Sequence, residues 1–332
     1  MPTDPSKPDD CGVTDRAPTT TTQPDGMSEY GTQLEEASPL EPPRWVSEIV
    51  GELPANGSTP GSVASVRCGS FLLVRGRLPG VSGRSADVLS EATRDLYRQV
   101  LGAVRELGCA HPVRAWNFIP GILAEAGNGL NRYMAFNTGR FVAMRDWFSG
   151  CGGLERGVPT ATGVGCDGDD LWLYLLAGER RGIPTENPRQ RPAYRYSKEW
   201  GPLPPCFARA TFVDLDGTRT LLCGGTSSVR GEKSAHEGDL RQQIEETFTN
   251  LDELPVAAGL VDPKSDDTAA ARTFREMRIY HPRPADADTI RQTTRSRYPG
   301  LRRIETVCVD LCRRELLVEI EAVADLDRGC PA

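Results

Sequence analysis

Residues 316–324 read Leu-Leu-Val-Glu-Ile-Glu-Ala-Val-Ala, and the architecture of the chain is clearest here. The apolar, partly β-branched run is typical of a strand that is buried in a sheet. Two acidic residues, Glu319 and Glu321, interrupt it at alternate positions. Because side chains on a strand alternate between the two faces of a sheet, both carboxyl groups lie on one face. We therefore expect a core strand near the C-terminus that carries two carboxyl groups to one side.

The residues before this strand alternate between strand and helix patterns. Residues 208–213 and 220–223 predict two strands, which the turn sequence Asp214-Leu215-Asp216-Gly217 joins as a hairpin. Apolar side chains at helical spacing follow the hairpin. Further elements are expected as a helix over 238–254, a strand over 274–280, a short helix over 285–296 and a strand over 304–310.

The first half of the chain shows a similar order. Strands are expected within 61–76, and apolar residues spaced by three and four predict an amphipathic helix over 86–107. Both halves then read strand, strand, long helix, strand, strand, strand, which indicates an internal duplication. The expected fold is α+β, with two fused repeats that each place helices on one face of a mixed sheet. The remaining strands of the first half are expected over 113–119, 134–142 and 171–176.

Composition limits where the chain works and what it binds. Residues 1–43 hold nine acidic and two basic residues and few apolar ones, so they are expected to form a disordered tail whose deletion to residue 40 is harmless. This tail accounts for the net charge of -7, and the remainder has no basic stripe for nucleic acid. The start, MPTDPSKPDD, lacks a signal-peptide pattern, and no apolar run reaches the roughly 20 residues of a membrane span. A cytoplasmic protein with reduced cysteines is expected.

Several second-half segments resemble the RidA (YjgF-like) family, whose fold is also described as chorismate-mutase-like. The resemblance rests on Phe207-Ala208-Arg209-Ala210, on Cys223-Gly224-Gly225-Thr226-Ser227, on the helix from Gln243 to Gly259, and on the closing strand. It implies a diverged N-terminal RidA-like half over 44–200 and a catalytic C-terminal half over 201–332. RidA proteins form trimers with sites between subunits, so a monomer and a homotrimer both stay open.

Three first-half segments are similar to the chorismatase family, which fuses a diverged RidA-like half to a catalytic one. They are Ala115-Trp116-Asn117-Phe118-Ile119-Pro120, Asn131-Arg132-Tyr133-Met134-Ala135-Phe136-Asn137 and Pro159-Thr160-Ala161-Thr162-Gly163-Val164-Gly165. The resemblance implies an enzyme that needs no cofactor, binds the small molecule chorismate and cleaves it to pyruvate and 3-hydroxybenzoate. Chorismate hydrolysis to a diene-diol, RidA-type imine deamination and a silent binding module are the alternatives.

One position argues against imine deamination. RidA deaminases place an arginine fifteen residues before the first glutamate of their closing Glu-Ile-Glu segment. An ungapped count back from Glu319 reaches Ile304, although Arg302 and Arg303 lie close by. Taken as it stands, the arginine that holds the deaminase substrate is missing.

Glu319 is the expected general acid. Cleaving an enolpyruvyl ether requires a proton on its terminal methylene carbon, and a buried carboxyl group keeps that proton near neutral pH. The alternative is that Glu319 and Glu321 point outward from a half-buried strand. The family resemblance favours a catalytic role and favours Glu319 over Glu321.

The substrate carries two carboxylates, which call for arginines and tyrosines. The alternatives are solvated arginines, core tyrosines and, for Cys312, an inert buried thiol. Chorismatases that form 3-hydroxybenzoate resemble this chain in having a cysteine at 312 and a glycine near 225, where diol-forming relatives have alanine. The residues expected to contact the substrate are Tyr133, Arg140, Arg191, Tyr196, Arg209, Thr226 and Ser227, with Glu319, Cys312 and Gly225 at the reacting centre.

Other motifs in the sequence do not support a cofactor or metal site. Gly163-Val164-Gly165-Cys166-Asp167-Gly168 matches a dinucleotide fingerprint, but a strand pattern follows it where a helix is required. The three histidines are far apart, and Cys308 and Cys312 lack further ligands for a zinc site. No metal site is expected.

Overall fold

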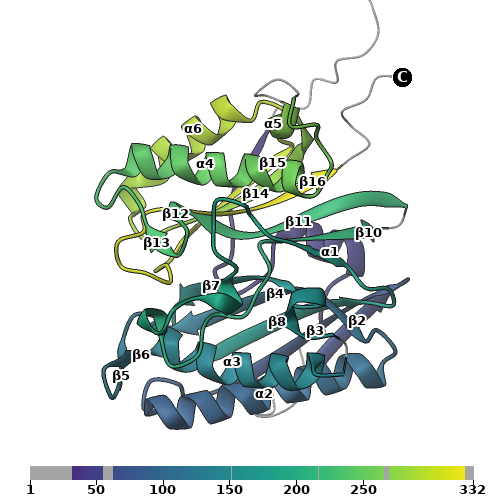
Figure 1. Ribbon diagram of the computed structural model, residues 1–332, viewed down its shortest axis with the longest axis vertical. Helices are drawn as coiled ribbons and strands as arrows, with labels where there is room; N and C mark the ends of the chain where they lie inside the picture. The colour runs from purple at the N-terminus through teal and green to yellow at the C-terminus, as the bar shows by residue number, and fades with distance from the viewer. Residues whose placement is uncertain (1–31, 55–62, 151, 216, 265–268, 326–332) are drawn as a thin grey trace, which may run out of the picture. The chain divides into compact units, whose positions relative to one another are not determined.

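A computed structural model of the chain describes residues 32–54, 63–150, 152–215, 217–264 and 269–325. Two repeats with the same order of elements, β-β-α-β-α-β-β, make up most of this part. Figure 1 shows them as two sheets that face each other, each with its helices on the outer side. The expected α+β class and the duplication are confirmed.

The first repeat forms a five-stranded sheet in the order β2-β3-β8-β4-β7. Neighbouring strands are antiparallel except β4 and β7, which are parallel. The elements are β2 (Val63–Cys68), β3 (Phe71–Leu78), α2 (Ala86–Glu106), β4 (His111–Pro120), β5 (Glu125–Gly127), β6 (Leu130–Asn131), α3 (Arg132–Phe148), η1 (Leu154–Arg156), β7 (Thr160–Cys166) and β8 (Leu171–Gly178).

The second repeat follows the same plan, with sheet order β10-β11-β16-β14-β15 and a single parallel pair, β14 with β15. Each strand thus occupies the place of its counterpart in the first repeat. The elements are β10 (Ala210–Leu215), β11 (Thr218–Ser227), β12 (Val229–Arg230), β13 (Lys233–Ser234), α4 (Leu240–Ala257), α5 (Ala269–Thr273), β14 (Phe274–His281), η4 (Pro284–Asp286), α6 (Ala287–Arg297), β15 (Arg303–Cys308) and β16 (Glu319–Asp325).

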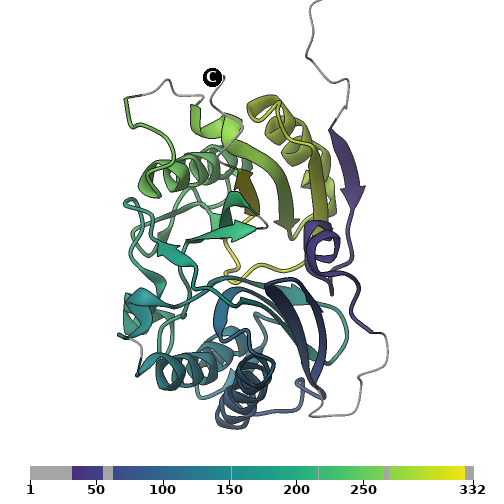
Figure 2. The ribbon, with the colours of Figure 1, turned by 90° about the vertical axis from the view of Figure 1, so that its right-hand side faces the viewer.

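Two short strands extend the second sheet to seven. β9 (Ile183–Thr185) pairs with β10, although it precedes the expected boundary at residue 200. At the other edge β1 (Gln33–Glu36) runs parallel to β15, as Figure 2 shows. The remaining elements are α1 (Arg44–Val50), η2 (Ala193–Arg195) and η3 (Lys198–Trp200).

Three apolar clusters hold these layers together. One lies between α2, α3 and the first sheet, and another lies between α4, α6 and the second sheet. The third fills the space between the sheets, where Trp116 and Phe118 of β4 belong to the same cluster as Tyr280 of β14 and Val323 of β16. This central cluster joins the two repeats into one unit, so a pocket between them has fixed walls.

The strand expected over 134–142 is wrong, because these residues lie in helix α3. The Asn131 side chain caps the helix by accepting a hydrogen bond from the Met134 amide at 2.9 Å. An ideal Cβ on Gly139 would lie 2.1 Å from the Ser90 carbonyl oxygen of α2, so the two helix backbones are in close contact. This packing overrides the strand preference of Phe141 and Val142. Helix α3 is the counterpart of the second helix of the other repeat, so the two repeats match more closely than the sequence indicated.

The expected disordered tail over 1–43 extends too far along the chain, because its last residues are ordered. Residues 33–36 form β1, and Ala37 and Leu40 pack on the cluster between the sheets. Composition could not reveal this, because β1 is held by backbone hydrogen bonds to β15. Residues 1–31 lie outside the described part.

No helix within the described ranges is long and apolar enough to cross a membrane.

Candidate active site

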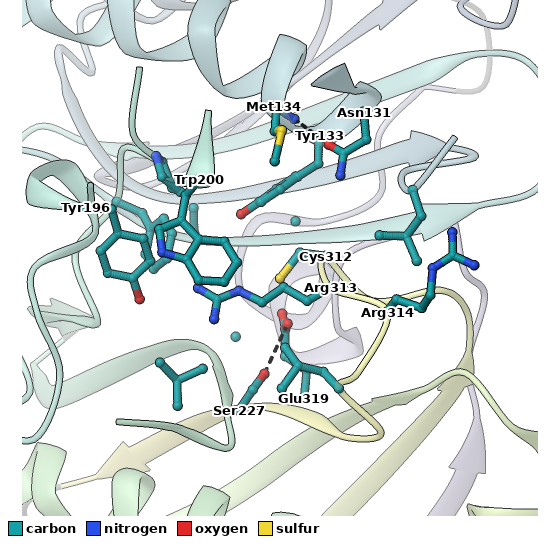
Figure 3. A pocket seen from close by; sticks show the side chains of 18 of the residues that line it. Asn131, Tyr133, Met134, Tyr196, Trp200, Ser227, Cys312, Arg313, Arg314 and Glu319 are labelled. Carbon is teal, nitrogen blue, oxygen red and sulfur yellow. Dashed lines mark hydrogen bonds between the residues drawn. The ribbon is translucent and has the colours of Figure 1, made fainter. Parts of the chain in front are cut away.

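A pocket of about 250 Å³ opens between the two repeats. Its walls come from α3, the connection before β10, the end of β11, the loop before β16 and the first residue of β16. In Figure 3 Tyr133 lies above the space, Ser227 and Glu319 lie below it, and Cys312 lies between Tyr133 and Glu319. The lining residues expected from the sequence are Tyr133, Arg140, Tyr196, Arg209, Gly225, Ser227, Cys312 and Glu319.

Glu319 opens β16 and is only 4% exposed. The Ser227 hydroxyl donates a hydrogen bond to its Oε2 at 3.3 Å. Burial, followed by the negative charge of Glu321, raises the pKa of Glu319 to about 7. The carboxyl group therefore keeps a proton at a pH where an exposed glutamate has lost it, and it can act as a general acid.

Gly225 makes this position available. β11 changes register against β16 between Cys223 and Thr226, and Gly225 lies in this bulge. An ideal Cβ on Gly225 would lie 2.0 Å from Glu319 Oε1. The missing side chain leaves the space that the Glu319 carboxyl group occupies.

Cys312 forms part of the apolar wall. It packs against both the first helix–sheet cluster and the cluster between the sheets. Burial raises the pKa of its thiol to about 12, so the sulfur is a neutral thiol near pH 7. The residue can exclude water from the pocket but does not provide a thiolate.

Two buried arginines supply the positive charge. Arg140 is 1% exposed and Arg209 is 5% exposed, and both guanidinium groups lie against the ring of Phe207, at 5.6 and 5.1 Å from its centroid. Arg140 donates to the Asn137 side-chain oxygen, and Arg209 donates to the Tyr196 hydroxyl at 2.6 Å. Across the described ranges neither arginine forms an ion pair, and the Nε of each has no hydrogen-bond partner.

The charge of the buried Glu186 acts on Arg209 without an ion pair forming. Buried guanidinium groups that form no ion pair are typical of a site for anionic groups. The pocket thus combines two buried guanidinium groups, which form no ion pair with the described residues, with a carboxyl group whose pKa is raised to about 7. This combination suits a small substrate that carries two carboxylates and needs a proton.

Comparisons with known proteins agree with this chemistry. Residues 50–177 match the family model described as chorismatase FkbO/Hyg5-like, N-terminal. A 3-hydroxybenzoate synthase of Streptomyces hygroscopicus is 34% identical over 285 residues, which are 84% of this chain and 80% of that protein. A chorismatase of the same species is 32% identical and is matched over 74% of this chain and 69% of its own length.

The chain belongs to the chorismatase family. A solved chorismatase structure has the same fold, with a TM-score of 0.69 and 29% identity over 83% of this chain and 80% of that one.

Two residues expected at this chorismatase site do not line it. The Arg191 side chain is 51% exposed and faces Glu232, and its contribution is a backbone carbonyl that accepts a hydrogen bond from Arg209 at 3.1 Å. Thr226 is buried, but its hydroxyl donates to the Gly224 carbonyl at 3.0 Å. Alternation along β11 explains this, because Gly225 and Ser227 face the pocket and the residue between them faces away.

Other lining residues were not expected from the sequence. The Arg313 guanidinium lies 3.4 Å from the centroid of the Trp200 ring, so η3 and the loop before β16 close one side of the pocket together. The pair Arg313-Arg314 directly after Cys312 was the available signal, since adjacent cations beside a reacting centre suit an anionic substrate. The lining residues that were not expected are Leu123, Asn131, Met134, Ala161, Gly163, Trp200, Pro205, Phe207, Val229, Arg313, Arg314, Glu315 and Leu316.

The structure also explains the missing deaminase arginine. Ile304 is fully buried in the cluster under α4 and α6, away from the pocket. Arg303 forms ion pairs with Glu48 and Glu276, and Arg302 is exposed. Neither reaches the pocket lining, so a small gap does not restore the deaminase pattern. Among the described residues, no three or more His, Cys, Asp or Glu side chains gather as metal ligands.

Proposed function

We propose that the protein cleaves the enolpyruvyl ether of chorismate and forms pyruvate and 3-hydroxybenzoate. The observation that carries the proposal is the pair of buried arginines without an ion pair beside a glutamate whose pKa is raised to about 7. Arg140 and Arg209 bind the two carboxylates of chorismate, and Glu319 faces the enolpyruvyl group. The relative named chorismatase supports the substrate, and the relative named 3-hydroxybenzoate synthase supports the product.

The reaction begins with proton transfer from Glu319 to the terminal methylene carbon of the enolpyruvyl group. An oxocarbenium ion results, and its positive charge weakens the bond between the ether oxygen and the ring. A neighbouring ring hydroxyl attacks that ring carbon, loses its proton and displaces pyruvate, whose carbonyl oxygen is the former ether oxygen. The oxide that remains on the ring opens to the phenol. The proton lost by the hydroxyl replaces the one that Glu319 gave, and no water is consumed.

The walls favour this route over hydrolysis. Cys312 is a neutral, weakly polar side chain where a water molecule would need hydrogen-bond partners. Gly225 leaves room for the Glu319 carboxyl group, which is buried from solvent. If water reached the oxocarbenium ion instead, both ring hydroxyls would survive and a diene-diol would form.

Product analysis in labelled water tests the proposal. Purified protein is incubated with chorismate and a chelator, pyruvate is followed, and the aromatic product is identified by chromatography and mass. We expect pyruvate together with 3-hydroxybenzoate that carries no oxygen from the water. A diene-diol as the main product overturns the product assignment, and absence of pyruvate overturns the activity.

A further inference from the structure

We propose that Glu321 and Thr162 form a positioning pair that holds Gly225 and the proton donor Glu319 in place and sets the pH range in which that donor works. This inference rests on the proposed function and assigns a role to the second carboxylate of the closing strand. Glu321 does not line the pocket, so it is a positioning residue and not a catalytic one.

Glu321 lies in a fully buried polar network between the two sheets. It is 3% exposed, and Arg114 beside it is 1% exposed. Arg114 of β4 and the Thr162 hydroxyl of β7 both donate to its Oε2, the latter at 2.5 Å. The Trp116 ring N–H and the Tyr280 hydroxyl each donate to its Oε1 at 3.2 and 3.1 Å. Because every partner donates, the group in this place is a carboxylate that accepts on both oxygens.

The network reaches Gly225 through Thr162. The Thr162 oxygen also accepts a hydrogen bond from the Gly225 amide at 3.2 Å and another from Arg114 at 2.5 Å. A backbone amide and a guanidinium can only donate, so the single hydroxyl proton of Thr162 points at Glu321. The charge of Glu321 therefore fixes the hydroxyl, and the hydroxyl fixes the bulge at Gly225.

The same arrangement controls Glu319 in two ways. First, the carboxyl group of Glu319 occupies the space next to Gly225, so its position depends on the bulge. Second, Glu321 projects from the same face of β16 and places a negative charge nearby, which raises the pKa of Glu319 in addition to the larger effect of burial. Charged groups on other elements also act on Glu319: Arg114 on β4 and Arg209 before β10 lower its pKa. The other titratable groups around it are Tyr133 on α3 and Cys312, Arg313 and Glu315 in the loop before β16.

The sign of the expected effect follows from these charges. Replacing Glu321 by glutamine removes the negative charge and leaves Arg114 uncompensated, and both changes lower the pKa of Glu319. Because Glu319 must be protonated to act, the high-pH limb of kcat/KM should move to lower pH by about one unit. Thr162→Val loosens Gly225 without changing any charge, so it should lower kcat several-fold with a smaller pH shift, and Thr162→Ser should restore kcat.

A second buried pair provides the control for a merely structural role. Glu305 of β15 is 3% exposed and pairs with Arg278 of β14 at 2.8 Å, so Glu305→Gln disturbs the folded state in a similar way. A structural role predicts that Glu321→Gln and Glu305→Gln both lower the yield of folded enzyme and leave the pH profile unchanged. The proposal requires that only Glu321→Gln moves the profile.

Infrared spectroscopy of the Glu319 carboxyl group makes the test independent of turnover. The protonated carboxyl band is assigned by its loss in Glu319→Gln and is titrated in wild type, Glu321→Gln and Glu305→Gln. We expect a lower titration midpoint in Glu321→Gln alone. Equal midpoints in all three proteins overturn the positioning role, even if the enzyme acts on chorismate. A shifted midpoint without pyruvate release from chorismate would overturn the proposed function and keep the electrostatic coupling.

Discussion

The Glu319 carboxyl group occupies the space that a side chain at Gly225 would fill, since an ideal Cβ on the glycine would lie 2.0 Å from Oε1 and 2.7 Å from Cδ of the glutamate. Real atoms do not approach so closely, so any side chain at 225 must move the carboxyl group. The residue at position 225 thus determines the position of the proton donor as well as the room available for the substrate ring.

Gly225→Ala should therefore reduce the rate of 3-hydroxybenzoate formation by about 10–100-fold, because a displaced acid loses much of its catalytic effect. Together with Cys312→Ala, which opens room for water, it should divert part of the flux to the diene-diol. Chromatography of the products measures both effects. Gly163→Ala is the control in the same pocket, since its Cβ would meet Tyr133 at an ordinary 3.4 Å. Equal losses from the two alanines would contradict the steric argument.

Eight of the ten expected site residues line this pocket, and 134–142 is the one expected element whose type differs in the structure. Glu319 was predicted because burying a charged group in an apolar strand is costly, so a glutamate there indicates a functional role. The contact with Gly225 joins residues far apart in the chain, and only the pairing of β11 with β16 brings them together. Alternation on β11 was readable in principle and would have excluded Thr226 while keeping Ser227.

Arg209→Gln should raise KM for chorismate by about 10–100-fold, because one substrate carboxylate loses a charge-assisted partner. Arg140→Gln should do the same through the other carboxylate. Arg191→Gln is the matched control, since that side chain is half exposed and outside the pocket. Steady-state kinetics separate binding from folding defects, because a loss of folded enzyme lowers apparent kcat and leaves KM unchanged. A KM effect at Arg191 equal to that at Arg209 would refute the assignment.

Glu319→Gln should make the protein more stable above pH 7 while removing most of its turnover. The pKa of Glu319 is about 7 in the folded state and near its ordinary value when unfolded, so the folded form binds the extra proton between about pH 4.5 and 7. Stability falls as pH rises through that window, and the cost reaches up to about 3 kcal/mol above it. Glutamine has no such cost.

Urea unfolding at pH 5 and pH 8 checks this pH dependence. The stability of Glu319→Gln relative to wild type should be clearly higher at pH 8 than at pH 5. Exposed Glu237 provides the control, because Glu237→Gln should show a similar difference from wild type at both pH values. If Glu319→Gln were no more stable than wild type at pH 8, the carboxyl group would not be held protonated by burial.

The start of the described chain shows why composition was misleading there. Acidic and polar residues predicted a dispensable tail, but a parallel edge strand needs only backbone hydrogen bonds and no apolar face. The Ala37 amide donates to the Thr306 carbonyl at 3.0 Å, and the Thr32 hydroxyl donates to the Leu301 carbonyl at 2.9 Å. Such contacts have no signature in a sequence.

Deleting residues 1–40 should therefore destabilise the protein relative to deleting residues 1–31. The longer deletion removes β1 from the edge of β15 and removes the Ser38 carbonyl, to which the buried Arg278 donates at 3.2 Å. Loss of an acceptor for a buried charge, together with strand contacts, costs about 2–4 kcal/mol. Thermal unfolding of the two purified truncations measures the difference, and kcat/KM of each at a temperature where both are folded separates stability from activity. Equal melting temperatures would show that β1 contributes nothing to the sheet and would return the boundary of the dispensable tail to residue 40.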